Sequence, residues 1–177
     1  VLDHEFYYNT SSNENNNSVV TLFTQGESHY LFTGDLEAGG EKSLVENNPN
    51  LPKCRLYKAA HHGSNSANSK RLLDVIEPEI VCVTCCAGSF EYTKTWSNTF
   101  PAQEVVNRIL TYTDKIYVTT YSTEDQKDYK SLNGTITFIS DGVNYEIHGS
   151  ENDTKLTDTV WYKKRLENIE KQEKEEA

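Results

Sequence analysis

The chain has 177 residues, of which 36% are hydrophobic and 25% are charged, a composition that suits one globular domain or part of a larger one. Its formal net charge of −10 argues against broad electrostatic attraction to nucleic acid or anionic membranes, although bound divalent metals would add positive charge that this sum omits. No apolar run reaches the roughly 18 to 20 residues of a membrane helix, and no signal-peptide pattern is present, so a cytoplasmic setting is expected.

The sequence begins at Val1 and contains no methionine, which predicts a processed or excerpted piece of a longer chain. Its four cysteines are not a disulfide scaffold. Cys82 and Cys85 form a Cys-x-x-Cys, a spacing that can indicate zinc or thiol redox chemistry. They lie three residues apart in the most apolar predicted strand, where such positions face opposite sides. Buried structural cysteines are therefore the expectation.

Hydrophobic periodicity and turn residues predict the elements in chain order. Residues 1–17, rich in tyrosine and asparagine, are expected to be a flexible lead-in. Residues 18–150 should form the domain, and residues 151–177 a charged C-terminal helix or tail whose last part is solvated. Strands are expected at residues 18–24, 29–33, 54–60, 79–85, 115–120, 135–139 and 143–148. Helices are expected within residues 37–50, at 68–76, at 101–112 and from about residue 158.

The order of these elements indicates a mixed α/β (α+β) fold. Strands alternate with helices through most of the chain, which is typical of a sheet layered with helices. Asp141-Gly142 between the last two strands is a strong hairpin signal. The expected architecture is thus a layered sheet that closes with a terminal hairpin and a C-terminal helix.

Two polar motifs follow strand-like runs and carry side chains that bind metals. Asp35 comes after Tyr30-Leu31-Phe32-Thr33-Gly34, and His61-His62-Gly63-Ser64 follows Leu56-Tyr57-Lys58-Ala59-Ala60. A carboxylate at one strand end and imidazoles at the next are what a metal-dependent hydrolase needs at the edge of a sheet. Adjacent strand residues point to opposite faces, so both histidines can reach one pocket only if the strand ends before them. The Gly63-Ser64 turn predicts that it does.

These motifs resemble the C-terminal half of metallo-β-lactamase-fold hydrolases, and in particular the hydrolase domain of bacterial competence DNA-uptake channel proteins and their stand-alone relatives. The likeness covers residues 17–142. It is carried by the Asn-rich turn into Ser18-Val19-Val20, by Phe32-Thr33-Gly34-Asp35 followed by Glu41, by the double-histidine motif with Ser66, and by Asn133-Gly134-Thr135-Ile136 leading to Asp141-Gly142.

The resemblance implies an αβ/βα sandwich with two divalent metals, zinc or manganese, at one edge, and phosphodiester hydrolysis by a metal-activated water. It implies that Asp35 bridges the metals. We expect His62 to be a metal ligand, His61 to be the catalytic group that contacts the substrate phosphate or a leaving oxygen, and Ser64 to contribute to substrate binding. The reverse assignment within the histidine pair stays open.

Two departures from the family pattern define what else is expected. The His- and Asp-rich metal motif of the N-terminal half is absent, so that half of the domain is an expected partner that supplies the other ligands. Phe100 stands where many relatives place a histidine before the proline. The predicted function is metal-dependent hydrolysis of a phosphodiester, with DNA among the candidate substrates, and the fragment alone is expected to be inactive. The alternative is an inactive binding or scaffold module that keeps the fold.

Overall fold

The computed structural model describes residue 2 and residues 14–176 of the chain. Most of the expected lead-in therefore lies outside the described residues. Its last part, Glu14–Asn17, forms a 3-10 turn instead of a flexible segment. The Asn16 side chain is buried there and accepts hydrogen bonds from the backbone N–H groups of Glu37 and Gly40, each at 3.1 Å. Asn16 thus satisfies free N–H groups at the start of the first helix.

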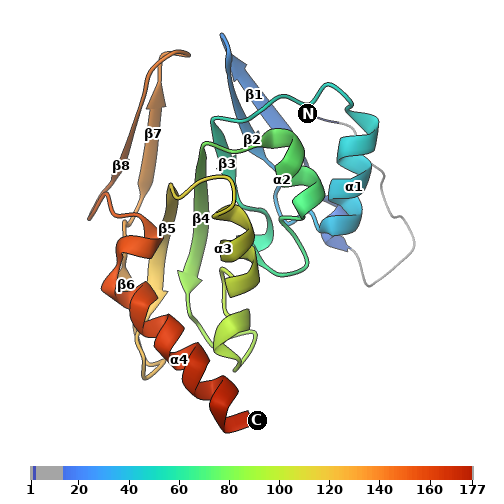
Figure 1. The fold of residues 1–177 in the computed structure, drawn as a ribbon. Coiled ribbons are helices and arrows are strands. Elements are labelled where there is room, and N and C mark those ends of the chain that lie inside the picture. Colours follow the sequence, from blue (N-terminus) through green and yellow to red (C-terminus); the bar gives the residue numbers. More distant parts are fainter. Residues whose placement is uncertain (1, 3–13, 177) are drawn as a thin grey trace.

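The centre of the molecule is a six-stranded sheet with the strand order β1-β2-β3-β4-β5-β6 (Figure 1). The four inner strands are parallel, and the two edge strands are antiparallel to their neighbours. A separate two-stranded sheet is formed by the hairpin of β7 and β8. The strands are β1 (Thr21–Gln25), β2 (Ser28–Phe32), β3 (Leu56–Lys58), β4 (Ile80–Ala87), β5 (Ile116–Ser122), β6 (Tyr129–Ser131), β7 (Ile136–Ser140) and β8 (Tyr145–Gly149).

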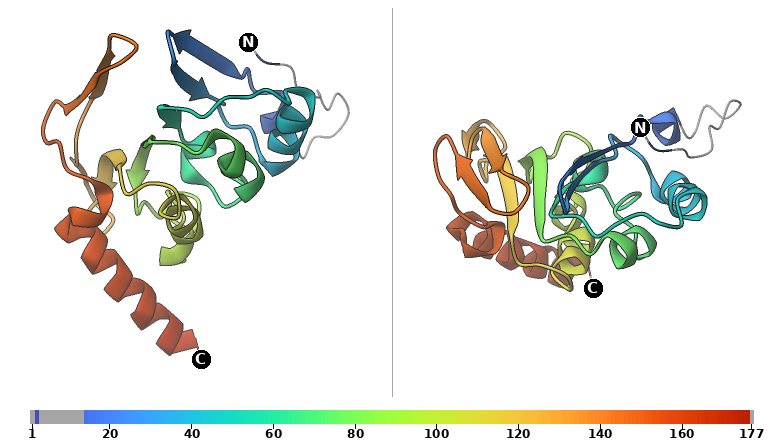
Figure 2. Two further views of the ribbon diagram at one scale, coloured as in Figure 1. Left: turned by 45° about the horizontal axis from the view of Figure 1, so that its top comes forward. Right: turned by 90° about the horizontal axis from the view of Figure 1, so that it is seen from above.

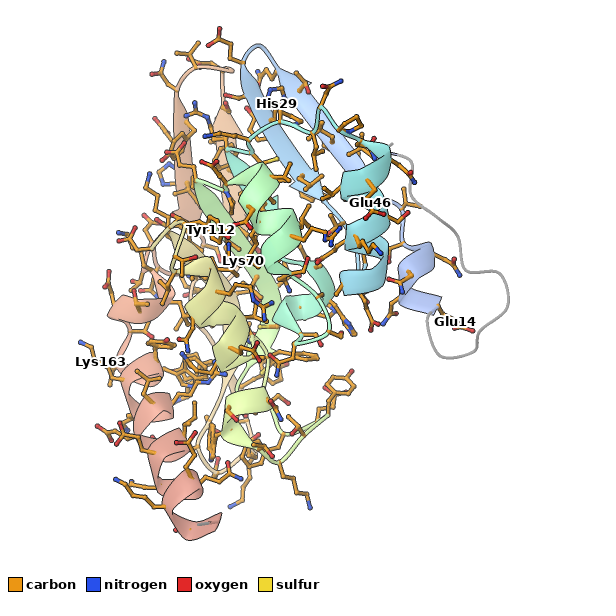
Figure 3. All side chains as sticks on the ribbon, turned by 45° about the vertical axis from the view of Figure 1, so that its right-hand side comes forward. Glu14, His29, Glu46, Lys70, Tyr112 and Lys163 are labelled. Atoms are coloured by element: carbon orange, nitrogen blue, oxygen red, sulfur yellow. The ribbon has the colours of Figure 1, made fainter. Side chains whose placement is uncertain are left out.

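Four helices accompany the sheets, and the mixed α/β class is confirmed. They are α1 (Ala38–Asn47), α2 (Lys70–Ile76), α3 (Gln103–Ile109) and α4 (Val160–Glu176). Figure 2 shows α1, α2 and α3 on one side of the central sheet and the β7–β8 hairpin on the other. Figure 3 shows the side chains around this helical layer, with Glu46 on α1 and Lys70 on α2, both of which are exposed.

The helical face of the sheet holds the main hydrophobic core. Leu31, Tyr57 and Val81 point from three neighbouring strands into this core and are each fully buried. The second helix supplies Leu72, Leu73 and Ile76, whose spacing places them on one face. This helix begins where the Ser69 hydroxyl accepts a hydrogen bond from the Leu72 N–H, as expected of an N-cap serine.

The opposite face of the sheet packs against the hairpin. Tyr30, Leu56 and Tyr117 form a smaller buried cluster with apolar side chains of β7 and β8. The Tyr30 hydroxyl donates to the Ser140 hydroxyl at 2.7 Å, and the Ser28 hydroxyl donates to the Gly142 carbonyl at 2.8 Å. These contacts fix the hairpin over β2, but they leave much of this face open.

The two cysteines of the Cys-x-x-Cys motif separate as predicted. Cys82 belongs to the hairpin-side cluster, whereas Cys85 packs against the helical core. The pairing of β4 with β5 shifts between Val83 and Cys86, which marks a bulge in β4. Burial raises the pKa of Cys54, Cys82 and Cys85 to about 12, so these thiols are protonated at neutral pH.

Two further features differ from the sequence-based expectation. Strand β6 was not predicted, because its three residues are all exposed and give no alternating pattern. The C-terminal helix is not simply solvated. Lys163 points outward in Figure 3 and is exposed, but Arg165 is 1% exposed. The Arg165 guanidinium donates to the carbonyls of Thr99 and Pro101 at 3.0 and 2.7 Å, and this contact anchors α4 to the body of the molecule.

Candidate functional site

The two predicted motifs meet at one edge of the sheet. Phe32 at the end of β2 pairs with Lys58 at the end of β3, and Lys58 pairs with Cys82 in β4. Because these strands are parallel, the loops that follow them leave the sheet side by side. In open α/β sheets, ligands bind outside such carboxyl ends of strands. The structure therefore brings the Asp35 turn and the histidine loop together.

The histidine loop has an unusual backbone. His61, His62 and Gly63 have φ angles of 45°, 54° and 82°, all in the left-handed region. For residues with a Cβ this conformation costs roughly 1–2 kcal/mol each. Such strain persists only where the surroundings impose it, and it is concentrated at functional sites. The strand ends at Lys58, so the prediction that it stops before the histidines is confirmed.

Hydrogen bonds at both ends hold the loop in this conformation. The His61 N–H donates to the Gly34 carbonyl at 3.0 Å, which ties the loop to the Asp35 turn. The Ala102 N–H donates to the Gly63 carbonyl at 2.8 Å. A Cβ on Gly63 would lie 2.5 Å from the Pro101 Cβ, so no larger residue fits there. The loop is therefore fixed by β2 on one side and by the start of α3 on the other.

A hydrogen bond from one of its ring nitrogens to the backbone orients the His62 side chain. Nδ1 lies 2.6 Å from the Thr84 carbonyl oxygen, which can only accept, so Nδ1 carries the proton. In the neutral ring this leaves the Nε2 lone pair free, and Nε2 lies 3.8 Å from the Asp35 Oδ1. Metal-binding histidines are commonly oriented in this way, by a carbonyl that accepts from the other nitrogen. The pair thus presents one imidazole nitrogen and one carboxylate oxygen to the same space.

His61 contacts a different set of side chains. Its Nδ1 lies 3.3 Å from the Ser66 hydroxyl and 3.6 Å from the Glu37 carboxylate. The Ser66 hydroxyl in turn donates to the Glu37 carboxylate at 3.1 Å. His61 is therefore held by a hydroxyl and a carboxylate on its Nδ1 side, and Nε2 lies outside these contacts.

Asp35 and Ser64 are both partly exposed. The Asp35 side chain is 40% exposed, and its backbone N–H donates to the Ser18 hydroxyl at 3.1 Å. The Ser64 hydroxyl lies 3.0 Å from the Ser66 hydroxyl. Ser64 thus stands beside the contacts of His61, where the predicted role in substrate binding remains a prediction.

Lys58 adds a positive charge near Asp35. Its side chain is half-buried, and Nζ donates to the Ala59 carbonyl at 3.0 Å. Burial lowers the Lys58 pKa, while the negative charge of Asp35 acts in the opposite direction. The site therefore combines the carboxylates of Asp35 and Glu37 with two imidazoles and a partly desolvated ammonium group.

A buried carboxylate supports the histidine loop from behind. Glu41 is fully buried in α1 and accepts hydrogen bonds from the backbone N–H groups of Asn68 and Ser69 at 2.6 and 2.7 Å. The Asn68 side-chain oxygen accepts from the Ala60 N–H and from the Tyr57 hydroxyl. Burial raises the Glu41 pKa, although its hydrogen bonds lower it in part. Glu41 thus fixes the Asn68 turn, which fixes the start of the histidine loop.

Phe100 closes the side of the site that faces α3. Its ring centroid lies 5.9 Å from that of His61 and 6.3 Å from that of His62, and it is stacked on His62 with an interplanar angle of 27°. An apolar ring therefore packs on both histidines at the position before the proline and offers the site no ligand atom.

These groups do not complete a metal centre by themselves. Among residues 2 and 14–176, no group of three or more His, Cys, Asp or Glu side chains could hold a metal ion. Asp35 and His62 can contribute one oxygen and one nitrogen to an ion with bonds of roughly 2.0–2.2 Å. Stable zinc sites usually have three or four protein ligands. The donor set fits part of a metal site and needs ligands from elsewhere.

A large groove opens next to these ligands on the hairpin side of the sheet. Its volume is about 1120 Å³. It runs between the sheet and the hairpin and includes Phe32, Lys58, Thr84 and Phe138. Phe23 and Phe32, whose rings are in edge contact, are 57% and 36% exposed at its border. This is an incompletely covered apolar surface beside a polar site.

Several contributing residues were not predicted as part of the site. Tertiary contacts, which the spacing of residues in the sequence does not reveal, bring in Glu37 and Thr84 and give Glu41 its supporting role. The sequence singles out Ser66 and Glu41 only through the family resemblance. The sequence does contain one signal for Glu37: its carboxylate follows Asp35 by two residues in the same turn, which places it near the predicted site.

Comparison with known proteins identifies several bacterial relatives. The chain is 26% identical over 124 residues to ComE operon protein 3 of Bacillus subtilis, a match that spans 70% of this chain and 15% of the relative. It is 28% identical over 109 residues to Recombination protein 2 of Haemophilus influenzae, across 62% of this chain and 13% of the relative. It is 29% identical over 109 residues to Competence protein ComA of Neisseria gonorrhoeae, across 62% and 15%.

These matches are limited in extent. The chain spans only 13% to 15% of the length of these three relatives. No protein-family model matches the chain, and no solved structure matches it. Within the described residues, no helix has the length and apolar character needed to cross a bilayer. The chain is therefore similar, at low identity, to a short part of bacterial proteins that include one named for competence.

Proposed function

We propose that this chain is the C-terminal half of a metallo-β-lactamase-fold domain that hydrolyses phosphodiester bonds with the help of divalent metals. The similarity to competence-related proteins makes DNA the first substrate to test. The observation that carries the proposal is the pairing of His62 with Asp35. A carbonyl fixes the proton of His62 on Nδ1, and Nε2 faces the Asp35 carboxylate at 3.8 Å.

Asp35 and His62 would hold the metal from this side of the site. Divalent metals in such sites lower the pKa of bound water and neutralise charge on phosphate oxygens. The carboxylate of Asp35 has two oxygens and can contact two ions, which an imidazole nitrogen cannot do. The nearby Lys58 ammonium adds positive charge on the groove side of the carboxylate.

His61 would act on the substrate. Ser66 and Glu37 contact its Nδ1, so the ring is oriented and Nε2 can donate a hydrogen bond to a phosphate or leaving oxygen. The Glu37 carboxylate lies behind the ring, as the orienting carboxylate does in catalytic histidine–carboxylate pairs. Ser64, next to Ser66, offers a hydroxyl to the same substrate.

The groove on the hairpin side suggests where the rest of the domain packs. A second layer over this face would cover Phe23 and Phe32 and bring the missing ligands toward Asp35 and His62. The resulting αβ/βα sandwich is the arrangement implied by the family resemblance. It would also bury Lys58 further beside Asp35.

The proposal is tested with the complete domain and a chromogenic phosphodiester such as bis-p-nitrophenyl phosphate. We expect manganese- or zinc-dependent hydrolysis that Asp35→Ala abolishes without loss of the fold, because Asp35 lies in an exposed turn. Circular dichroism provides the fold control. Full activity of the Asp35→Ala variant would rule out this site.

One observation favours a second candidate, an inactive binding or scaffold module. The apolar Phe100 ring packs on both histidines at the position where many relatives are expected to have a histidine. A module of this kind would bind no metal. Elemental analysis of the complete domain after dialysis separates the two candidates, since only the hydrolase retains stoichiometric metal.

A further inference from the structure

A row of aromatic rings leads from the histidine loop to the surface. The Phe100 ring is stacked on His62 at an interplanar angle of 27° and on Tyr92 at 28°, with centroid distances of 6.3 and 5.6 Å. Tyr92 is 74% exposed, so it carries this row into solvent. An exposed aromatic ring beside a polar site offers a flat apolar face on which another ring can stack.

The same three residues line a small cavity. Its volume is about 190 Å³, and Thr93, Asn98 and Glu91 contribute polar groups to its wall. Ordinary small-molecule sites are larger, roughly 300–1,000 Å³. The cavity is therefore suited to one flat group and not to an extended ligand or a duplex. Because His62 belongs to its wall, a group bound there lies next to the proposed metal ligands.

The charge of the molecule limits what can bind by phosphate contacts alone. The net charge is −10, and Glu91 stands at the cavity itself. A nucleic acid held only through its phosphates would be repelled at long range. Stacking on an aromatic ring does not require positive charge, and each base–aromatic stack contributes roughly 1–3 kcal/mol. Flat bases therefore fit this surface better than a bare phosphate backbone does.

We propose that the exposed ring of Tyr92, backed by the Phe100 ring stacked on it, is a stacking platform for one unpaired nucleobase that adjoins the phosphodiester bound at His61 and His62. The placement of that phosphodiester rests on the proposed function. The platform makes single-stranded nucleic acid the substrate class, because a base inside a duplex is already stacked and cannot enter the cavity. Phe100, where the family pattern has a histidine, then supports the Tyr92 ring instead of binding metal.

The test is a fluorescence anisotropy titration of the full 177-residue chain with manganese present. One probe is a labelled deoxythymidine oligomer with phosphorothioate linkages, which resist hydrolysis, and the other is an abasic oligomer of the same length and linkage. We expect tighter binding of the thymidine oligomer. Tyr92→Ala should weaken its binding roughly 5- to 100-fold, the scale of one lost stack, and should leave the abasic oligomer unaffected.

Two variants serve as controls. Tyr92→Phe keeps the ring and should bind like the parent chain. Tyr129→Ala removes another tyrosine, 71% exposed on β6 and not part of the cavity wall, and should also bind like the parent chain. Equal binding of both oligomers by the parent chain, or an equal loss on both in Tyr92→Ala, would overturn the platform, as would the absence of binding.

The platform and the hydrolase can fail separately. If the thymidine preference depends on Tyr92 but the complete domain does not hydrolyse a phosphodiester, the platform stands and the hydrolase does not. If the complete domain hydrolyses bis-p-nitrophenyl phosphate but no base preference is seen, the hydrolase stands and the platform does not.

Discussion

The two faces of the central sheet differ in how completely they are covered. On the helical face, side chains such as Leu31, Tyr57 and Val81 are fully buried under α1, α2 and α3. On the opposite face the hairpin covers only part of the sheet, and a groove of about 1120 Å³ remains. The candidate ligands lie at the border of the two. The helical face therefore supplies stability, and the open face is where binding and assembly are expected.

Matched leucine substitutions on the two faces test this contrast most strongly. Leu31→Ala on the helical face should lower the free energy of unfolding by about 2–5 kcal/mol, because a tightly packed core cannot close the cavity that the shortened side chain leaves. Leu56→Ala on the neighbouring strand should cost less, since Leu56 is 8% exposed and lines the existing groove. Urea denaturation of both variants gives the comparison. Equal losses would show that the hairpin face is as tightly closed.

A substitution at Glu41 tests a buried polar contact on the helical face. Glu41→Gln replaces one accepting oxygen with an NH2 group that faces the backbone N–H of Asn68 or Ser69. The loss should be about 1–3 kcal/mol, the scale of a buried donor left without an acceptor. Glu46→Gln is the matched control on the same helix, exposed and paired at the surface with Arg71. It should change stability by less than about 0.5 kcal/mol.

The same Glu41→Gln variant links stability to the site. If the Asn68 turn loosens, the His61–His62 loop should lose its fixed conformation, and hydrolysis by the complete domain should fall more than in Glu46→Gln. A variant that is destabilised but fully active at low temperature would show that Glu41 supports only the core.

The smallest expected effect concerns how fast the buried thiols react in the folded chain. At pH 8 the thiols of Cys54, Cys82 and Cys85, with pKa values of about 12, should react slowly with Ellman's reagent in the folded chain. Full reaction of all cysteines is expected in guanidinium. Rapid reaction of Cys82 or Cys85 would contradict their burial, and zinc bound by both would contradict their placement on opposite faces.

Much of the sheet could be predicted from sequence because its strands and turns carry local signals. The strand ends before Asp35 and before His61 followed from glycine-containing turns, and the Asp141-Gly142 hairpin from its turn residues. Strand β6 gave no such signal, since its residues are exposed and its pairing with β5 is a tertiary contact.

The site was predictable only where its residues adjoin the motifs. Nothing local indicates that the Thr84 carbonyl fixes the His62 proton, because that contact depends on a bulged neighbouring strand. The buried Arg165 was missed for a similar reason. It lies in a run of charged residues, and only the docking of α4 on the Thr99–Pro101 segment reveals its role.

We propose that Asp35 and His62 hold metal while His61 acts on the substrate. Bound metal and phosphodiester hydrolysis, measured together in three alanine variants of the complete domain, test this division of roles. Asp35→Ala and His62→Ala should lose both metal and activity. His61→Ala should keep its metal but turn over roughly 100-fold more slowly, the scale for losing one charge-stabilising group. Full metal content and parental rates in both histidine variants would show that neither histidine has the proposed role.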